Sequence, residues 1–348
     1  MILNHLIILS DDARFNIDIQ GKILYSFLGC FTPPEKLRCL SLSELQALDN
    51  ITTDYLFIGM PTHFNTRDLH QITFKHVVLF DYFDEPRLRW DYSDQLFLKS
   101  LSSLYLKTSR LNHLPIIDDV KIGLLPIFFN AHVRTILHHR SLSRHSPRFL
   151  KHLWFQKRKI DIHFIGTPTW LDKFSTGTST NYFQRVDWLL ELMPAARHSF
   201  FGGLLQLPYF PLDQCQSQHG PIDHLFFKGQ KLDFETYFNT MLQSKIVLAP
   251  AGHSRWTYRH FEGVWSYSFV ISNDISAIET LVPIPKEALF LIPDHQPVLP
   301  IIDRLLTHPK TYWDRLDHGV NFLSRYLESG NYYPGKPLPH QLFMAQLA

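Results

Sequence analysis

Short apolar runs alternate with amphipathic segments throughout the first half of the chain. An uninterrupted apolar run predicts a buried parallel strand, whereas apolar positions three and four residues apart predict a helix. In order along the chain, the first half is predicted to contain a strand at 3–9, a short helix at 42–48, strands at 55–59 and 76–80, and a helix at 94–105. Such alternation is typical of βα units that build a parallel sheet.

The pattern changes in the segment 133–159, which is dense in Arg, Lys and His and contains Ser146-Pro147. We interpret this segment as an exposed helix and a hinge between domains. A second series of elements follows: a strand at 161–165, a helix at 181–193, a strand at 198–201, a loop at 207–221, a helix at 234–243, strands at 245–249, 269–271 and 288–292, and helices at 297–306 and 311–327. The patterning therefore predicts two α/β domains.

Composition narrows the class of protein. With 348 residues, 45% of them hydrophobic, the chain is long enough for two domains with substantial cores. A formal net charge of +2 gives no domain-wide basic surface, so no nucleic-acid partner is expected. No stretch approaches the ~20 apolar residues of a membrane-spanning helix, and residues 1–9 lack the features of a signal peptide. The three cysteines show no metal-ligand spacing and favour a reducing compartment, so we expect a cytoplasmic protein with at most peripheral membrane contact.

The segment Ser244–Asp274 is the most informative, because it combines strand, glycine loop, helix and strand with charged residues at the helix start. The apolar run Lys245–Ala249 is ended by Pro250 and Gly252, and a helix is predicted to begin near Thr257. The amino end of a helix prefers an anion, and open α/β sheets bind ligands at the carboxyl edge of their strands. The segment therefore predicts a site for a nucleoside diphosphate.

Two charged residues of this helix fit such a ligand. Arg259 could make a bidentate contact with phosphate, and Glu262, one turn later on the same face, could accept hydrogen bonds from ribose hydroxyls. The structural alternative is an ordinary intrahelical ion pair on a solvated face. Further candidates for phosphate binding lie in the loops after two strands of the second half: Gly252, His253, Ser254, Arg255, Thr257, Gly166 and Thr167. For the polar residues among them, the alternative is a capped turn with exposed side chains.

The order of Ser-Lys, an apolar strand, Pro-x-Gly, Trp-Thr-x-Arg-x-Phe-Glu, a helix and a strand ending in Asn-Asp resembles the donor-binding segment of exostosin-like glycosyltransferases, which belong to the GT-B superfamily. Residues 76–86, 104–109 and 123–127 are similar to the acceptor-side domain of the same enzymes. Where those enzymes carry Ala-x-Gly before the last strand, this chain has Trp265-Ser266-Tyr267-Ser268, so the close packing of helix on strand must be made differently. The resemblance implies a GT-B architecture of two Rossmann-like domains facing each other across a cleft: an acceptor-side domain at 1–150, a nucleotide-sugar donor domain at 151–310, and a C-terminal helix at 311–348 that packs back toward the first domain.

The same resemblance implies a reaction. A sugar would pass from a nucleotide-diphosphate donor, bound as co-substrate, to a hydroxyl of a glycan, lipid-linked or protein acceptor, with inversion and without a metal or other cofactor. Arg259, with Arg255, would stabilise the charge on the leaving diphosphate. The transfer needs one general base. The candidates follow strands of the first half, and Asp84 is preferred over Asp81, Glu85 and His63. Helix capping or turn formation is the structural alternative for each of them.

Other interpretations are open at this point. The histidines at 132–145 lie among arginines that repel a cation, and Asp81-x-x-Asp84 differs from the Asp-x-Asp spacing of metal-dependent transferases, so neither group predicts a metal site. A catalytically inactive GT-B relative, binding nucleotide sugars or acting as a scaffold, would keep the donor loops without a working base. A nucleotide-sugar epimerase of the same shape would convert its donor with no acceptor present.

Overall fold

The computed structural model describes residues 4–9, 17–29, 31–60, 69–82, 88, 96–102, 104–112, 116–117, 119–126, 148–173, 177–194, 197–206, 208, 210–230, 232–330 and 338–348. The chain forms two compact units. Unit 1 comprises residues 1–130, 277–283 and 329–348, and unit 2 comprises residues 131–276 and 284–328. Two segments of unit 1 therefore follow residues of unit 2 in the sequence.

Unit 1 contains a seven-stranded sheet in the order β2-β1-β3-β4-β5-β8-β7. All neighbouring strands are parallel except β7 and β8. The strands are β1 His5–Leu9, β2 Leu37–Ser41, β3 Ile51–Gly59, β4 Ile72–Asp81, β5 Leu104–Lys107, β7 Ile116–Ile117 and β8 Val120–Leu124. A separate antiparallel pair, β6 Arg110–Leu111 with β13 Ile278–Glu279, joins residues far apart in the sequence.

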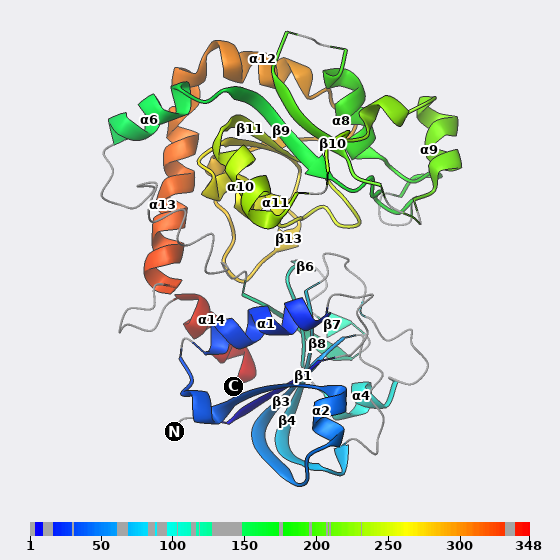
Figure 1. Cartoon of the computed structure of the whole chain (residues 1–348), viewed down its shortest axis with the longest axis vertical. Helices are drawn as coiled ribbons and strands as arrows, with labels where there is room; N and C mark the ends of the chain where they lie inside the picture. Colours follow the sequence, from blue (N-terminus) through cyan, green and yellow to red (C-terminus); the bar gives the residue numbers. More distant parts are fainter. Residues whose placement is uncertain are drawn as a thin grey trace. The chain divides into compact units, whose positions relative to one another are not determined.

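Two helices of unit 1 from opposite ends of the sequence pack together. The helices are α1 Ile17–Leu28, α2 Leu42–Gln46, α4 Leu96–Leu101 and α14 Leu338–Leu347, with a 3-10 turn at Pro34–Lys36. α1 lies beside α14, and the rings of Phe27 and Phe343 have centroids 5.5 Å apart (Figure 1). The Gln346 side chain fixes α14 to the last residue of β8 through hydrogen bonds to its N–H and C=O groups. A capping box of Ser41 and Glu44 begins α2.

Unit 2 contains a five-stranded, fully parallel sheet in the order β10-β9-β11-β12-β14. The strands are β9 Ile160–Gly166, β10 Phe200–Leu204, β11 Ser244–Ala249, β12 Phe269–Asn273 and β14 Leu289–Ile292. Numbered within the unit, this order is 2-1-3-4-5, that of a doubly wound α/β fold whose switch point lies between β9 and β11. β12 is buried along its whole length, as its continuous apolar run predicts.

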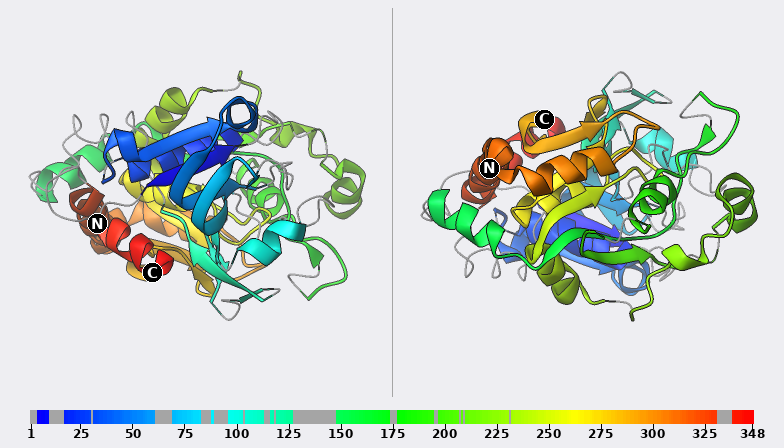
Figure 2. Two further views of the ribbon diagram at one scale, coloured as in Figure 1. Left: turned by 90° about the horizontal axis from the view of Figure 1, so that it is seen from below. Right: turned by 90° about the horizontal axis from the view of Figure 1, so that it is seen from above.

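Helices lie on both faces of this sheet. They are α6 Arg148–Gln156, α8 Gln184–Leu192, α9 Leu212–His219, α10 Phe234–Leu242, α11 Arg259–Trp265, α12 Leu299–Thr307 and α13 Trp313–Gly330, with 3-10 turns at Asp223–Leu225, Lys286–Ala288 and Pro309–Tyr312. α8 packs beside α12, and the Glu191 carboxylate accepts the N–H groups of Val298 and Leu299 at the start of α12. α10 and α11 lie together, apart from that pair (Figures 1 and 2).

Several element predictions are corrected by the structure. Residues 212–219 form helix α9, not a loop, because a largely polar sequence still buries one side through Cys215. The helix predicted to reach residue 105 ends at Leu101, and Tyr105 lies fully buried in strand β5. The predicted terminal helix at 311–327 is α13, and a separate helix, α14, follows it.

The structure shows how α11 approaches the sheet without the Ala-x-Gly sequence. Tyr267 takes the left-handed conformation at φ 55° that a glycine would adopt at the turn. The close contact is made one turn earlier by Gly263, where a Cβ would lie 2.7 Å from Val270 and 3.2 Å from Val247. In this chain the glycine therefore stands at a different position, and the close packing of the helix on the strand is kept.

Candidate functional site

The carboxyl ends of β9 and β11 lie side by side at the switch point of the unit 2 sheet. β9 ends at Gly166 and β11 at Ala249, and the two strands are hydrogen-bonded neighbours. The loops that follow them, 167–171 and 250–258, carry most of the predicted donor-binding residues. In a sheet of this order, ligands bind outside these strand ends.

Arg259, the first residue of α11, reaches the end of β9. Its Nη2 donates a hydrogen bond to the carbonyl oxygen of Ile165, and its Cζ lies 4.8 Å from the centroid of the Phe164 ring. A Cβ on residue 166 would lie 2.8 Å from Arg259 Nη2, so Gly166 leaves room for the guanidinium. The structure thus brings together two of the residues predicted for donor binding.

A second guanidinium, that of Arg185 in the first turn of α8, connects the two loops. Arg185 is only 5% exposed; its Nε donates to the Ala251 carbonyl at 3.1 Å and its Nη1 to the Thr167 carbonyl at 2.6 Å. A Cβ on Gly252 would lie 2.3 Å from Arg185 Nη2 and 2.7 Å from Thr169 Oγ1. The glycine loop therefore closes over a buried cation, which the sequence analysis did not include in the site.

Glu262 is hydrogen-bonded to the neighbouring helix α10. The Tyr237 hydroxyl donates to Glu262 Oε2 at 2.9 Å. Burial raises the pKa of Glu262, while the charge of Arg259 and the hydrogen bond from Tyr237 act in the opposite direction. The carboxylate is therefore held in one place by a second helix, which an ordinary ion pair on a solvated face would not require.

His260 closes the turn that leads into α11. His260 Nε2 lies 2.7 Å from Ser272 Oγ, and Nδ1 lies 2.8 Å from the Thr257 carbonyl oxygen and 3.1 Å from the Thr257 nitrogen. Burial lowers the pKa of His260 to about 4, consistent with a neutral ring. Thr257 and Ser254 are each 5% exposed, so their hydroxyls belong to the interior of the loop, and α11 begins two residues later than predicted.

Arg255 points to a carboxylate of the same unit. Its Nη1 and Nη2 donate to Asp294 Oδ1 at 2.8 Å and Oδ2 at 2.5 Å, and this hydrogen bonding raises the pKa of Arg255. Its charge is thereby compensated, which weighs against its predicted role as the second phosphate cation. His253 contacts the Trp170 ring edge to face, with centroids 5.0 Å apart.

Asp81 is the one predicted base candidate within the described part of the chain. It is fully buried, and its carboxylate accepts hydrogen bonds from Lys107 at 2.8 and 2.9 Å and from the Tyr105 hydroxyl at 2.6 Å. A general base must reach the acceptor hydroxyl. The prediction for Asp81 is therefore corrected, because a carboxylate enclosed in this way is a structural anion. The other candidates, Asp84, Glu85 and His63, lie outside the described residues.

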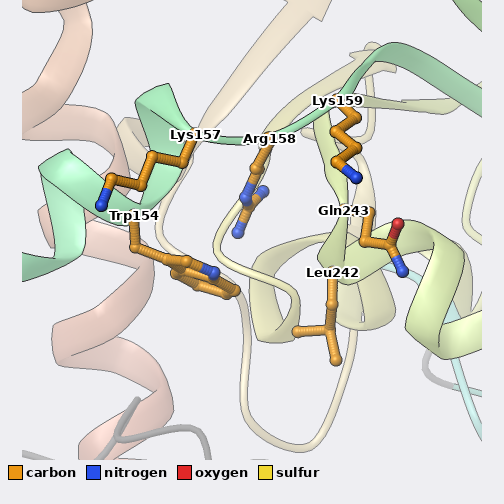
Figure 3. A pocket seen from close by; sticks show the side chains of 6 residues that line it. All are labelled: Trp154, Lys157, Arg158, Lys159, Leu242 and Gln243. Atoms are coloured by element: carbon orange, nitrogen blue, oxygen red, sulfur yellow. The ribbon is translucent and has the colours of Figure 1, made fainter.

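A cavity of about 270 Å³ lies at the opposite, amino-terminal edge of the unit 2 sheet (Figure 3). It is lined by Trp154, Lys157, Arg158, Lys159, Leu242 and Gln243. Arg158, 6% exposed, lies over the Trp154 ring and donates to the carbonyl oxygens of Ser244 and Ser266. Its guanidinium thus satisfies carbonyl groups where strands begin, and α6 and α10 both end here, where cations complement the helix dipole. The basic character of the cavity follows from this packing.

No group of three His, Cys, Asp or Glu side chains in the described part of the chain could hold a metal ion. Of the helices that the structure describes, none combines the length and apolar character needed to cross a membrane.

The sequence offered one signal for Arg185 and none for Tyr237. Arg185 stands in the first turn of the helix after the Gly166-Thr167 loop, where a cation can face that loop. Tyr237 lies on a helix that precedes the donor segment, and nothing in its local pattern marks it.

Comparisons with known proteins identify a fold and no sequence family. No protein-family model matches the chain, and no curated protein matches its sequence. Its structure is similar to a glycosyltransferase from Rickettsia africae ESF-5, with a TM-score of 0.52, 11% identity and coverage of 99% of this chain and 97% of that one. The N-terminal domain of trehalose-6-phosphate phosphatase from Candida albicans gives 0.52 and 12%, covering 99% and 89% of the chains. A UDP-forming α,α-trehalose-phosphate synthase from Burkholderia xenovorans gives 0.50 and 11%, covering 94% and 79%.

Identities this low show the fold alone. They give no specific support to the exostosin-like family. The predicted fold class is confirmed: the chain has the GT-B fold of glycosyltransferases, with two Rossmann-like α/β domains.

Proposed function

We propose that the protein is a glycosyltransferase that moves a sugar from a nucleotide-diphosphate donor to an acceptor hydroxyl, with inversion and without a metal. The observation that carries the proposal is the pair of guanidinium groups, Arg259 and Arg185, at the switch point of a GT-B fold. Negative charge develops on the leaving diphosphate, and cations already held in place stabilise it. The planar fork of arginine matches phosphate oxygens in pairs.

The remaining predicted residues take complementary roles in this proposal. Gly166 and Gly252 lack side chains beside the two guanidinium groups, which lets a diphosphate approach the loops. Glu262 accepts hydrogen bonds from the ribose. The general base is Asp84, with Glu85 and His63 as alternatives. The acceptor is a hydroxyl of a glycan, lipid or protein, and the reaction takes place in the cytoplasm, where free cysteines such as those of the described chain stay reduced.

The test compares two arginines of unit 2. Arg259→Ala should lower transfer about 30- to 1000-fold, corresponding to ~2–4 kcal/mol of lost transition-state stabilisation. Arg304, exposed on α12 away from the strand ends, provides the matched control, and Arg304→Ala should transfer at the rate of the unmodified protein. Product formation from a panel of nucleotide sugars and acceptors measures both, and the anomeric configuration of the product tests inversion. Equal rates in the two variants would remove Arg259 from the site.

A catalytically inactive GT-B relative is the second candidate. The burial of Asp81 removes one possible base, and one structural neighbour is a domain of a phosphatase, so the fold also occurs in a protein named for another reaction. This candidate predicts calorimetric binding of a nucleoside diphosphate with no product on any acceptor. Conversion or hydrolysis of the donor without an acceptor would instead indicate an epimerase-like enzyme.

A further inference from the structure

α10 and α11 are connected by a hydrogen bond between two side chains next to the proposed donor site. The hydroxyl of Tyr237, in the middle of α10, donates to Oε2 of Glu262 in the first turn of α11. This contact uses one of the two carboxylate oxygens. The bond therefore fixes the Glu262 side chain through Oε2, and the other carboxylate oxygen, Oε1, takes no part in it.

Tyr237 is itself held on two sides. Its ring meets His163 of β9 edge to face, with centroids 5.5 Å apart. Its carbonyl oxygen accepts the Thr240 hydroxyl at 2.7 Å, so His163 Nε2 donates to Thr240 Oγ1 at 2.9 Å. Burial lowers the pKa of His163 to about 3, and the ring stays neutral. The hydroxyl that reaches Glu262 thus comes from a side chain whose ring packs against His163 and whose backbone is hydrogen-bonded to Thr240.

The same carboxylate lies one helical turn from Arg259. The charge of Arg259 acts on this carboxylate, and the Tyr237 hydroxyl interacts with both charged groups. Tyr237 therefore fixes Glu262 beside the guanidinium, where the carboxylate can accept a ribose hydroxyl next to the diphosphate that Arg259 would bind.

We infer that Tyr237 is a positioning residue for ribose recognition, holding the Glu262 carboxylate so that it accepts a ribose hydroxyl of the nucleotide. The inference rests on the proposed function and adds a residue to its site. It predicts a specific defect in the Tyr237 variants. Only the part of the nucleotide affinity that comes from a ribose hydroxyl depends on Glu262, so only that part should be weakened.

The experiment measures how strongly the protein distinguishes ribose from deoxyribose. Calorimetric Kd values are determined for UDP, ADP and GDP, and for the 2′-deoxy and 3′-deoxy forms of the nucleotide that binds best. A charge-assisted hydrogen bond is worth ~1.5–3 kcal/mol, so the unmodified protein should prefer the ribonucleotide about 10- to 150-fold over one of the deoxy forms. Glu262→Gln should remove most of this preference, and Tyr237→Phe should reduce it about 3- to 10-fold.

Tyr312 supplies the matched control, because its ring packs on Phe290 in another part of unit 2. Tyr312→Phe should leave the preference unchanged. Placing p-aminophenylalanine at position 237 keeps an N–H donor in the same place and should restore the preference. Thermal melts confirm that each variant is folded.

Three outcomes decide the inference. A reduced preference in Tyr237→Phe with rescue by the amino analogue supports it. Equal weakening of ribo- and deoxyribonucleotide binding would overturn it and leave Tyr237 as a structural link between helices, while the proposed donor site stands. If the unmodified protein binds none of the nucleotides, the proposed function fails and the inference fails with it.

Discussion

Replacing Gly252 by alanine tests whether the glycine loop is built around Arg185. The added Cβ would lie 2.3 Å from Arg185 Nη2 and 2.7 Å from Thr169 Oγ1, distances that require one of them to move. Thr169 belongs to the backbone-anchored loop after β9, so the guanidinium should give way. Its displacement disturbs the hydrogen bonds to the carbonyl groups of Ala251 and Thr167.

The magnitude follows from those two bonds. Each charge-assisted hydrogen bond contributes ~1.5–3 kcal/mol, which sets an upper limit of roughly 3–6 kcal/mol if both are lost. A Gly→Ala change in an unstrained conformation stabilises by only ~0.4–1 kcal/mol through the unfolded chain, so the clash should dominate. With partial re-formation of the bonds, we expect Gly252→Ala to lower the unfolding free energy by about 2–4 kcal/mol and to weaken nucleoside diphosphate binding at least tenfold.

The assay combines denaturation followed by circular dichroism with calorimetric nucleotide binding. Gly177 is the control, because at φ 68° it has no atom within 4 Å of an added Cβ. Gly177→Ala should cost ~1–2 kcal/mol from backbone strain and leave nucleotide affinity unchanged. In an Arg185→Ala background, the Gly252→Ala change should cost less, because only the contact with Thr169 Oγ1 at 2.7 Å remains. Unchanged stability and affinity in Gly252→Ala alone would refute the reasoning.

Three further predictions concern buried groups. Asp81→Asn should lower the unfolding free energy by ~3–5 kcal/mol because it removes the carboxylate charge that faces the buried Lys107 ammonium. An additional Lys107→Met change should recover much of the loss in urea denaturation. His163 and His260 have pKa values lowered by burial to about 3 and about 4, so in the folded protein they bind fewer protons than in the unfolded chain below pH ~6.5. These two residues should contribute a fall in stability of up to about 2.7 kcal/mol per pH unit from pH ~6.5 toward ~4. A flat stability profile over this range would contradict the prediction. Phe343→Ala, which empties the contact between α14 and α1, should cost ~3–5 kcal/mol in the melting of unit 1, and an unchanged melt would show that α14 contributes nothing to its core.

The strands and the place of the proposed site could be predicted from the sequence because both depend on residues that are close together in the chain. The continuous apolar run before Pro250 predicts β11, and a glycine loop after a parallel strand predicts a ligand at the sheet edge. Partners brought together from distant segments were not predictable. Arg185 lies 66 residues from the carbonyl that it contacts, and no periodicity relates such positions.

The burial of charged side chains was also not predictable from the sequence. An acidic residue after a strand is equally compatible with a cleft and with an enclosed ion pair, and only the fold decides that Asp81 belongs to the second case. The same applies to Arg255, which on sequence alone is a free cation beside a glycine loop. Asp294, its partner, lies beyond three further strands in the sequence.

The order in which unit 1 is assembled from the sequence bears on its biosynthesis. β6 pairs with β13, and the Tyr55 hydroxyl and the Phe57 ring meet residues of α14, yet β13 and α14 leave the ribosome only after much or all of unit 2. The nascent sheet of unit 1 would therefore present an uncovered aromatic surface for the time that translation needs to reach residue 343. Exposed apolar surface of this kind attracts chaperones and promotes misassembly. Slow translation of the last third of the message should consequently lower the yield of folded protein more than slow translation of the first third.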